Sequence, residues 1–185
     1  EMRRRAKVIN FGILYGMGVN ALRVNLGVEN TTREEAQHFY DEYFKTFSTL
    51  AAFLEKIKAD ATKTGYTETF FGRRRYFPGL RSKLPFIRAS SERMAINAPF
   101  QGTCADILKL AMIRVDDYLK LEKLTEDAHL VMTVHDELVY EVRKSASAKI
   151  VPKISEIMER LIAPEKTAGV PLVVKASVGP NWGNV

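Results

Sequence analysis

Four side chains near the start of the sequence recur at steps of four residues, close to one turn of an α-helix. They are Arg3, Lys7, Phe11 and Tyr15, and on a helix they form a slowly drifting row about 18 Å long. Cations suit the phosphates of a nucleoside triphosphate, and an aromatic ring on the same face can pack on its sugar or base. An amphipathic helix with a solvated basic face explains the same pattern, so both interpretations stay open.

Two adjacent acids, Asp136 and Glu137, lie between two β-rich runs. A turn between strands can hold carboxylate oxygens rigidly, and oxygen is the ligand that Mg²⁺ prefers. Asp is also a common turn residue on structural grounds alone, so a metal site and a plain turn are both open. His135 can ligate a metal, donate a hydrogen bond or pack in the turn, and metal ligation is the least favoured of these roles.

Two further groups of polar side chains are candidates for contact with nucleic acid. The run Gly72-Arg73-Arg74-Arg75-Tyr76 suits a phosphate backbone, although a solvated charged turn explains it equally well. A polar stripe on an otherwise apolar helix can follow a minor groove or simply form the wet face of that helix. The stripe consists of Glu92, Arg93, Asn97 and Gln101.

The elements that must position these groups are mostly helical in the first part of the chain. Apolar periodicity, glycine stops and capping residues predict helices over 3–15 and 19–26, then one capped by Thr31 or Thr32, and one capped by Ser48 that runs to about residue 63. A hairpin or bent loop around Gly72, ending at Pro78, follows, and then one or two long helices over 86–122 interrupted near Pro99 and Gly102. Strands over 129–134 and 138–142, a helix over 150–162 and a last strand over 172–178 complete an α+β fold.

The charge of the chain is unevenly distributed. The net charge is +6; residues 1–93 hold 17 Lys and Arg against 10 Asp and Glu, whereas residues 94–185 hold 11 against 12. A basic half suits a partner rich in phosphate or serves as a solubilising surface. The single cysteine, Cys104, excludes an internal disulfide, fits a reducing compartment, and has apolar neighbours that predict burial.

The sequence shows no run of 18 apolar residues and no secretory signal at its start, which favours a soluble, untargeted chain. It begins with Glu and enters a helical pattern almost at once. We therefore expect it to be cut from a longer protein.

Four stretches, in this order over nearly the whole chain, resemble family A DNA polymerases of the bacterial DNA polymerase I type. They are Arg3-Arg-Arg-Ala-Lys7-Val-Ile-Asn-Phe11-Gly-Ile-Leu-Tyr15-Gly16, Gly72-Arg-Arg-Arg-Tyr76, Glu92-Arg-Met-Ala-Ile-Asn-Ala-Pro-Phe-Gln101-Gly-Thr-Cys-Ala-Asp106 and Val134-His-Asp-Glu137. Each stretch is modest alone, and the ordered set is specific. The resemblance implies helical fingers over 1–65 and a palm of antiparallel sheet and packed helices over 66–185, with an upstream palm strand, the thumb and the nuclease regions absent.

The resemblance also implies roles for the candidate residues. The helix at 3–15 looks like the fingers helix that closes over the incoming nucleotide, and the turn at Asp136 looks like part of a catalytic metal site. The roles implied are as follows: Arg3 and Lys7 on the phosphates, with Lys7 also catalytic; Phe11 and Tyr15 near sugar and base; Asp136 as metal-binding catalytic carboxylate with Glu137 beside it; His135 at the primer end; Arg93, Asn97 and Gln101 on primer–template; and Arg73, Arg74 and Arg75 on the duplex backbone.

The reaction implied is attack of a primer 3′-hydroxyl on the α-phosphate of a deoxynucleoside triphosphate, with two Mg²⁺ ions as cofactors. The family's second catalytic aspartate lies in an upstream motif resembling Asp-Tyr-Ser-Gln-Ile-Glu, which this sequence does not contain. We therefore expect the chain to supply half of the metal site and to be inactive by itself. Thr133 stands where many relatives carry glutamine, and its shorter hydroxyl cannot make the same reach toward a primer.

The partners implied are primer–template DNA and deoxynucleoside triphosphates, with no membrane, for a monomer that is part of a longer chain acting in replication or repair. The expected location is the bacterial cytoplasm, at the nucleoid, or an organellar equivalent. Two alternatives stay open. A single-subunit RNA polymerase shares parts of the pattern, although Phe11 and Glu137 favour the DNA enzyme, and a non-catalytic nucleic-acid-binding module would retain only the basic half.

Overall fold

The computed structural model of the protein describes residues 2–27 and 31–185. Residue contacts divide the chain into two compact units, the first ending at Thr103 and the second beginning at Cys104. The dividing point lies inside the long helix α5, Pro85–Leu121. The functional boundary between fingers and palm at residue 65 stays a prediction.

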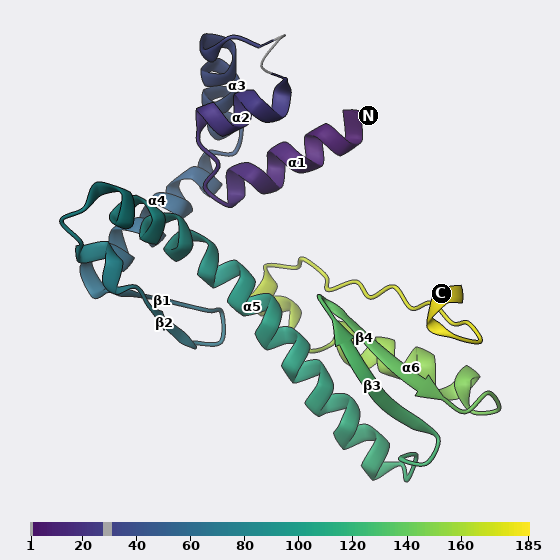
Figure 1. Cartoon of the computed structure of the whole chain (residues 1–185). Helices are drawn as coiled ribbons and strands as arrows, with labels where there is room; N and C mark the ends of the chain where they lie inside the picture. Colours follow the sequence, from purple (N-terminus) through teal and green to yellow (C-terminus); the bar gives the residue numbers. More distant parts are fainter. Residues whose placement is uncertain (1, 28–30) are drawn as a thin grey trace. The chain divides into compact units, whose positions relative to one another are not determined.

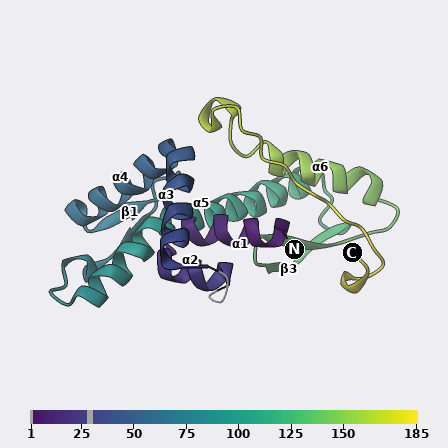
Figure 2. The same ribbon diagram turned by 90° about the horizontal axis from the view of Figure 1, so that it is seen from above.

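The first unit opens with three helices, α1 (Met2–Leu14), α2 (Val19–Leu26) and α3 (Arg33–Thr46), which lie side by side in Figures 1 and 2. They pack around the buried side chains of Ile9, Ile13 and Leu22. Ala6, Ile9 and Ile13 recur at helical spacing. Ile9 and Ile13 are buried, as this spacing predicts, whereas Ala6 is exposed.

Thr32 begins α3 with a capping box. Its hydroxyl accepts a hydrogen bond from the Glu35 amide at 3.1 Å, and the Glu35 carboxylate accepts one from the Thr32 amide at 2.7 Å. The predicted cap at Ser48 is wrong, because α3 runs almost directly into α4 (Ser48–Thr64) and Phe47 occupies the cap position without a side-chain bond. The α4 helix ends at Gly65, whose φ of 85° is left-handed, as the glycine stop predicted.

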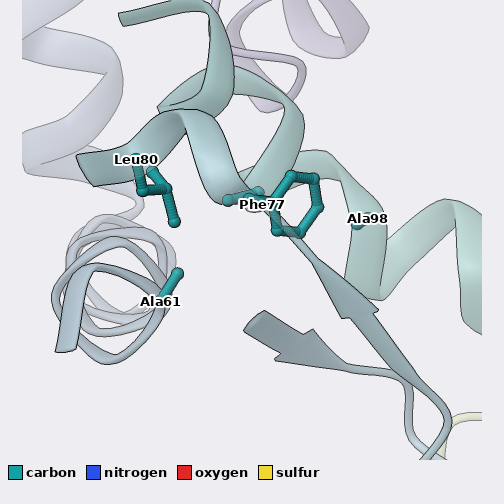
Figure 3. Close-up of a cluster of buried hydrophobic side chains, with 5 residues drawn as sticks. Ala61, Phe77, Leu80 and Ala98 are labelled. Carbon is teal, nitrogen blue, oxygen red and sulfur yellow. The ribbon is translucent and has the colours of Figure 1, made fainter. Parts of the chain in front are cut away.

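The hairpin predicted around Gly72 is present. Strands β1 (Tyr66–Glu68) and β2 (Arg74–Tyr76) pair antiparallel and lead into the 3₁₀ helix η1 (Pro78–Arg81). A small core fixes this hairpin to the neighbouring helices (Figure 3). Its members are Ala61 of α4, Phe77, Leu80, and Ala95 and Ala98 of α5.

Helix α5 is continuous over Pro85–Leu121, so the predicted interruption near Pro99 and Gly102 is wrong. Proline removes one helical donor, but the buried Ala95 and Ala98 pack this part of α5 into the core. Gly102 is a point of close approach instead: a Cβ there would lie 2.6 Å from the Thr69 Cγ2 atom.

In the second unit, β3 (Ala128–Val134) and β4 (Glu137–Val142) form the antiparallel pair that the sequence predicted. The end of α5 and the helix α6 (Ser147–Glu159) pack on this pair. Helix α6 confirms the predicted amphipathic helix over 150–162, although it begins and ends about one turn earlier. Tyr140 of β4 contacts the same core, and burial raises the pKa of its phenol to about 12. The core residues are Val115, Leu119, Ala128, Ile150 and Ile154.

The strand predicted over 172–178 is wrong. This segment is extended, and Leu172 and Val174 are half-buried between exposed neighbours, but no ladder pairs it with another strand in the described part of the chain. The Val174 amide donates to the Glu159 carboxylate at 3.1 Å instead. A β-rich sequence becomes a strand only where a neighbour offers backbone partners. Short 3₁₀ turns, η2 (Pro164–Thr167) and η3 (Trp182–Asn184), flank the segment.

The helices and small antiparallel sheets confirm the α+β class. Cys104 is exposed, contrary to the predicted burial. Among the helices described for residues 2–27 and 31–185, none combines the length and the apolar character needed to cross a lipid bilayer.

Candidate functional site

The row predicted on α1 faces outward. Arg3 and Lys7 are exposed, and the Lys7 Nζ atom lies 5.9 Å from the centre of the Phe11 ring. The rings of Phe11 and Tyr15 are stacked, with centroids 6.2 Å apart and planes 23° apart, and are 47% and 44% exposed. Because Ile9 and Ile13 hold the opposite side of α1 in the core, the two cations and nearly half of each ring are exposed to a ligand.

The end of this row meets α5 within the first unit. The Asn97 side-chain amide donates to the Tyr15 carbonyl at 3.2 Å. Gly16 has a φ of 78°, and a Cβ there would lie 3.1 Å from the Arg93 Cγ atom. Two predicted DNA-binding residues, Arg93 and Asn97, therefore lie at the end of the predicted nucleotide-binding row. Glu92 of the same polar stripe pairs with Lys58 at 3.2 Å instead.

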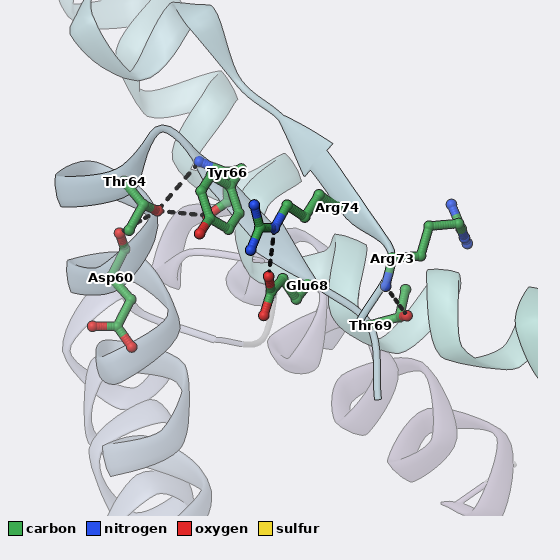
Figure 4. A network of polar contacts seen from close by, with 7 residues as sticks. All are labelled: Asp60, Thr64, Tyr66, Glu68, Thr69, Arg73 and Arg74. Atoms are coloured by element: carbon green, nitrogen blue, oxygen red, sulfur yellow. Dashed lines mark hydrogen bonds and ion pairs between the residues drawn. The ribbon is translucent and has the colours of Figure 1, made fainter. Parts of the chain in front are cut away.

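The three arginines of the hairpin are exposed, yet each also contacts another residue of the first unit. The Arg74 Nε atom donates to the Glu68 carboxylate at 2.6 Å, and its guanidinium lies 4.6 Å from the Tyr66 ring centre (Figure 4). The hydrogen bond to Glu68 raises the pKa of Arg74. The Arg75 guanidinium lies 5.3 Å from the centre of the Phe77 ring, and the residue is exposed.

Arg73 bridges the hairpin and α5. Its guanidinium donates to the Gly102 carbonyl at 3.1 Å, and its amide donates to the Thr69 hydroxyl at 3.1 Å (Figure 4). Arg73, Arg75 and Gln101 then line one cavity of about 200 Å³. The structure thus brings part of the basic hairpin and part of the polar stripe to the same place.

Thr67 lines this cavity from the middle of β1 and gives a prediction about stability. Its side chain is 7% exposed, and its hydroxyl is buried without a hydrogen-bond partner. Thr67→Val removes that buried hydroxyl with little change of shape. We expect the free energy of unfolding to rise by about 1 kcal/mol and the midpoint in thermal denaturation of the chain by about 3 °C.

The matched control is Thr103→Val, because the Thr103 hydroxyl accepts a hydrogen bond from the Phe70 amide at 2.9 Å. That variant is expected to lose about 1 kcal/mol. If both variants lose the same free energy of unfolding, the Thr67 hydroxyl must have a hydrogen-bond partner, and burying it does not destabilise the fold.

The acidic turn in the second unit is tighter than predicted. Val134 pairs with Glu137 across the ladder, so Glu137 belongs to β4 and only His135 and Asp136 form the loop. His135 takes a positive φ of 52°, which suits a two-residue hairpin loop. The side chains of His135, Asp136 and Glu137 are all exposed.

Asp136 and Glu137 offer the oxygen donors that Mg²⁺ prefers. Within residues 2–27 and 31–185, no three His, Cys, Asp or Glu side chains gather closely enough to hold a metal ion. The donor chemistry of the turn therefore fits Mg²⁺ in part, with further ligands needed from substrate, water or another segment.

The α1 row belongs to the first unit and the acidic turn to the second; their action on one ligand stays a prediction. Sequence patterns did not single out Thr67 or the pair formed by Asn10 and Tyr43, whose side chains are hydrogen-bonded. The only sequence signal for the pair was the position of Asn10 at the border between the apolar and polar faces of α1.

Comparisons with known proteins agree on one family. The model of DNA polymerase family A matches residues 1–184. DNA polymerase I of Pseudomonas aeruginosa is 46% identical over 182 residues, which are 98% of this chain and 19% of that protein. The thermostable DNA polymerase I of Thermus aquaticus is 41% identical over 181 residues, covering 98% of this chain and 20% of the relative.

Among solved structures, the chain is similar to the POL domain of Pol1 from M. smegmatis in complex with DNA primer-template and dNTP. The TM-score is 0.83 at 36% sequence identity, over 92% of this chain and 28% of that one. The chain spans about a fifth of the length of the curated relatives named above.

Proposed function

Because this chain belongs to DNA polymerase family A, we propose that it supplies the nucleotide-binding and DNA-binding part of a DNA-directed DNA polymerase. The observation that carries this proposal is the exposed row on α1, where Lys7, Phe11 and Tyr15 follow one another in contact. Membership of this family indicates that a deoxynucleotide is the ligand of the row, and the exposed side chains of α1 offer a surface on which it can bind. The solved relative named above was determined with primer-template and dNTP.

In this proposal, Arg3 and Lys7 bind the triphosphate of the incoming deoxynucleotide. Cationic donors form short hydrogen bonds to phosphate oxygens, and they counter the charge that develops on the leaving pyrophosphate. Phe11 and Tyr15 present ring faces to the sugar and base, since stacking on an aromatic ring tolerates every base. One helix thereby orients both ends of the nucleotide.

Primer–template DNA is the proposed partner of the hairpin and α5. Arg73, Arg75 and Gln101 surround one cavity, which supports binding of a backbone phosphate beside a groove-facing amide. Arg93 and Asn97 lie where α1 ends, next to the proposed nucleotide site. Arg74 is proposed to contribute charge to the same surface although it is already paired with Glu68.

The turn at the head of β4 is the proposed place of the metal ligand. Family A DNA polymerases generally depend on Mg²⁺, which when bound lowers the pKa of the attacking 3′-hydroxyl and neutralises phosphate charge. Asp136 would hold the ion, Glu137 would assist beside it, and His135 would position the primer end. We also propose that the protein acts in the cytoplasm, on chromosomal DNA at the nucleoid.

Primer extension tests this function and the incompleteness of the metal site together. We expect no measurable extension by the 185-residue chain, since only one of two catalytic aspartates is proposed to lie within it. A chimera in which the chain replaces the aligned segment of the Pseudomonas aeruginosa relative is expected to extend primers with deoxynucleotides. Extension by the chain alone would contradict the proposal that it supplies only half of the metal site. A strong preference of the chimera for ribonucleotides would favour the RNA polymerase alternative.

A further inference from the structure

A hydrogen bond links α1 to α3 beside the nucleotide-binding row. The Tyr43 hydroxyl donates to the Asn10 Oδ1 atom at 2.6 Å, across 33 residues of sequence. Asn10 directly precedes Phe11 and directly follows the buried Ile9. The bond therefore acts on the border between the core face of α1 and its ligand-facing row.

Packing restrains the Tyr43 ring independently of this hydrogen bond. It packs against the buried cluster of the first three helices, lies edge-on to Phe44 at 5.4 Å and is tilted on Phe47 at 4.9 Å between centroids. A ring fixed on several sides places its hydroxyl with little loss of entropy. A tyrosine hydroxyl keeps its proton at neutral pH and can donate, and burial raises the pKa of the Tyr43 phenol further.

The position of Asn10 on the helix matters for the direction of the row. Successive residues turn by about 100°, so Asn10 projects roughly sideways from both the buried stripe of Ile9 and Ile13 and the row containing Lys7 and Phe11. The hydrophobic effect is non-directional, whereas a hydrogen bond requires a defined distance and angle. A roll of about 20° would move a side chain about 5 Å from the axis by about 2 Å.

We infer that Tyr43 and Asn10 are a positioning pair that sets the rotation of α1 and so aligns Lys7 and Phe11 with the incoming nucleotide. This inference rests on the proposed function of the row. Neither residue needs to touch the nucleotide; both act through the helix that does. Misplacement of a binding group by about 1 Å already weakens catalysis strongly. Loss of the hydrogen bond between Tyr43 and Asn10 is therefore expected to change the KM for the deoxynucleotide.

The test is Tyr43→Phe in the polymerase chimera defined above, which keeps the ring and removes the hydroxyl. We expect the KM for the deoxynucleotide to rise about 3- to 10-fold, the size of effect that loss of one hydrogen bond produces, with unchanged affinity for primer–template. Asn10→Ala should give a similar rise, and the double variant should be no worse than the larger single one. Tyr40→Phe, in the same aromatic cluster, should leave the KM unchanged.

A second measurement uses the 185-residue chain itself. In hydrogen exchange, Tyr43→Phe should speed exchange of α1 amides around Asn10 and leave α5 unaffected. Additive KM effects of the two variants, or a Tyr43→Phe chain with wild-type KM or wild-type exchange in α1, overturn the positioning pair. An unaltered chimera that adds no nucleotide contradicts the proposed function instead, and the exchange experiment then still decides the contact.

Discussion

Asp136→Asn is expected to lower the rate of nucleotide addition by the chimera about 10³-fold while primer–template binding is kept. Asparagine retains the size of the side chain and one oxygen, but it removes the negative charge that would hold Mg²⁺. A metal ion contributes several kcal/mol to stabilising a phosphoryl-transfer transition state, and losing about 4 kcal/mol slows a reaction about 10³-fold. The measurement is single-turnover incorporation at saturating nucleotide, with DNA affinity measured by fluorescence anisotropy at the same salt concentration.

Glu141→Gln is the matched control, since Glu141 is an exposed acid on the same β4 strand and loses the same charge. Its rate should equal that of the unaltered chimera. Undiminished incorporation by Asp136→Asn would remove this turn from the chemistry and favour the alternative of a nucleic-acid-binding module.

Lys7→Met is expected to reduce kcat/KM for the deoxynucleotide by about 10- to 100-fold. Methionine keeps an unbranched side chain on α1 and removes the ammonium that would bind phosphate. Hydrogen bonds to charged groups contribute about 1.5 to 3 kcal/mol, which corresponds to about 10- to 100-fold in binding. Steady-state kinetics over a range of nucleotide concentrations measure this loss.

Lys45→Met serves as control, because Lys45 is an exposed lysine of α3 that pairs with Glu42 at 3.1 Å. It should leave kcat/KM unchanged within about 2-fold, as surface ion pairs contribute little. A Lys7→Met loss no larger than that of Lys45→Met would mean that the α1 row does not bind the triphosphate.

Local sequence signals predicted much of the fold because they act within one element. The cap at Thr32, one of the two caps predicted for this helix, the stop at Gly65 and the hairpin at Gly72 each depend on a few adjacent residues. The errors lie where distant parts of the chain decide. Packing around Ala95 and Ala98 carries α5 through Pro99, and the absence of a paired neighbour leaves 172–178 without a ladder in the described structure.

In the candidate site, too, features within one helix were predictable and contacts between distant residues were not. The row from Arg3 to Tyr15 could be read from helical spacing alone, and the contact of Lys7 with Phe11 agrees with it. The bond from Asn97 to Tyr15 joins residues far apart in sequence, and no period within one helix predicts it. The same holds for the bond from Tyr43 to Asn10, which joins α3 to α1 across 33 residues of sequence.

A structure of the active chimera with primer–template, deoxynucleotide and Mg²⁺ tests the central claim most directly. We predict the Lys7 ammonium at hydrogen-bond distance, about 3 Å, from the triphosphate, and the Asp136 carboxylate on the ion beside the α-phosphate. A triphosphate bound away from α1, with Lys7 left in solvent, or a metal ion held without Asp136, would contradict the account.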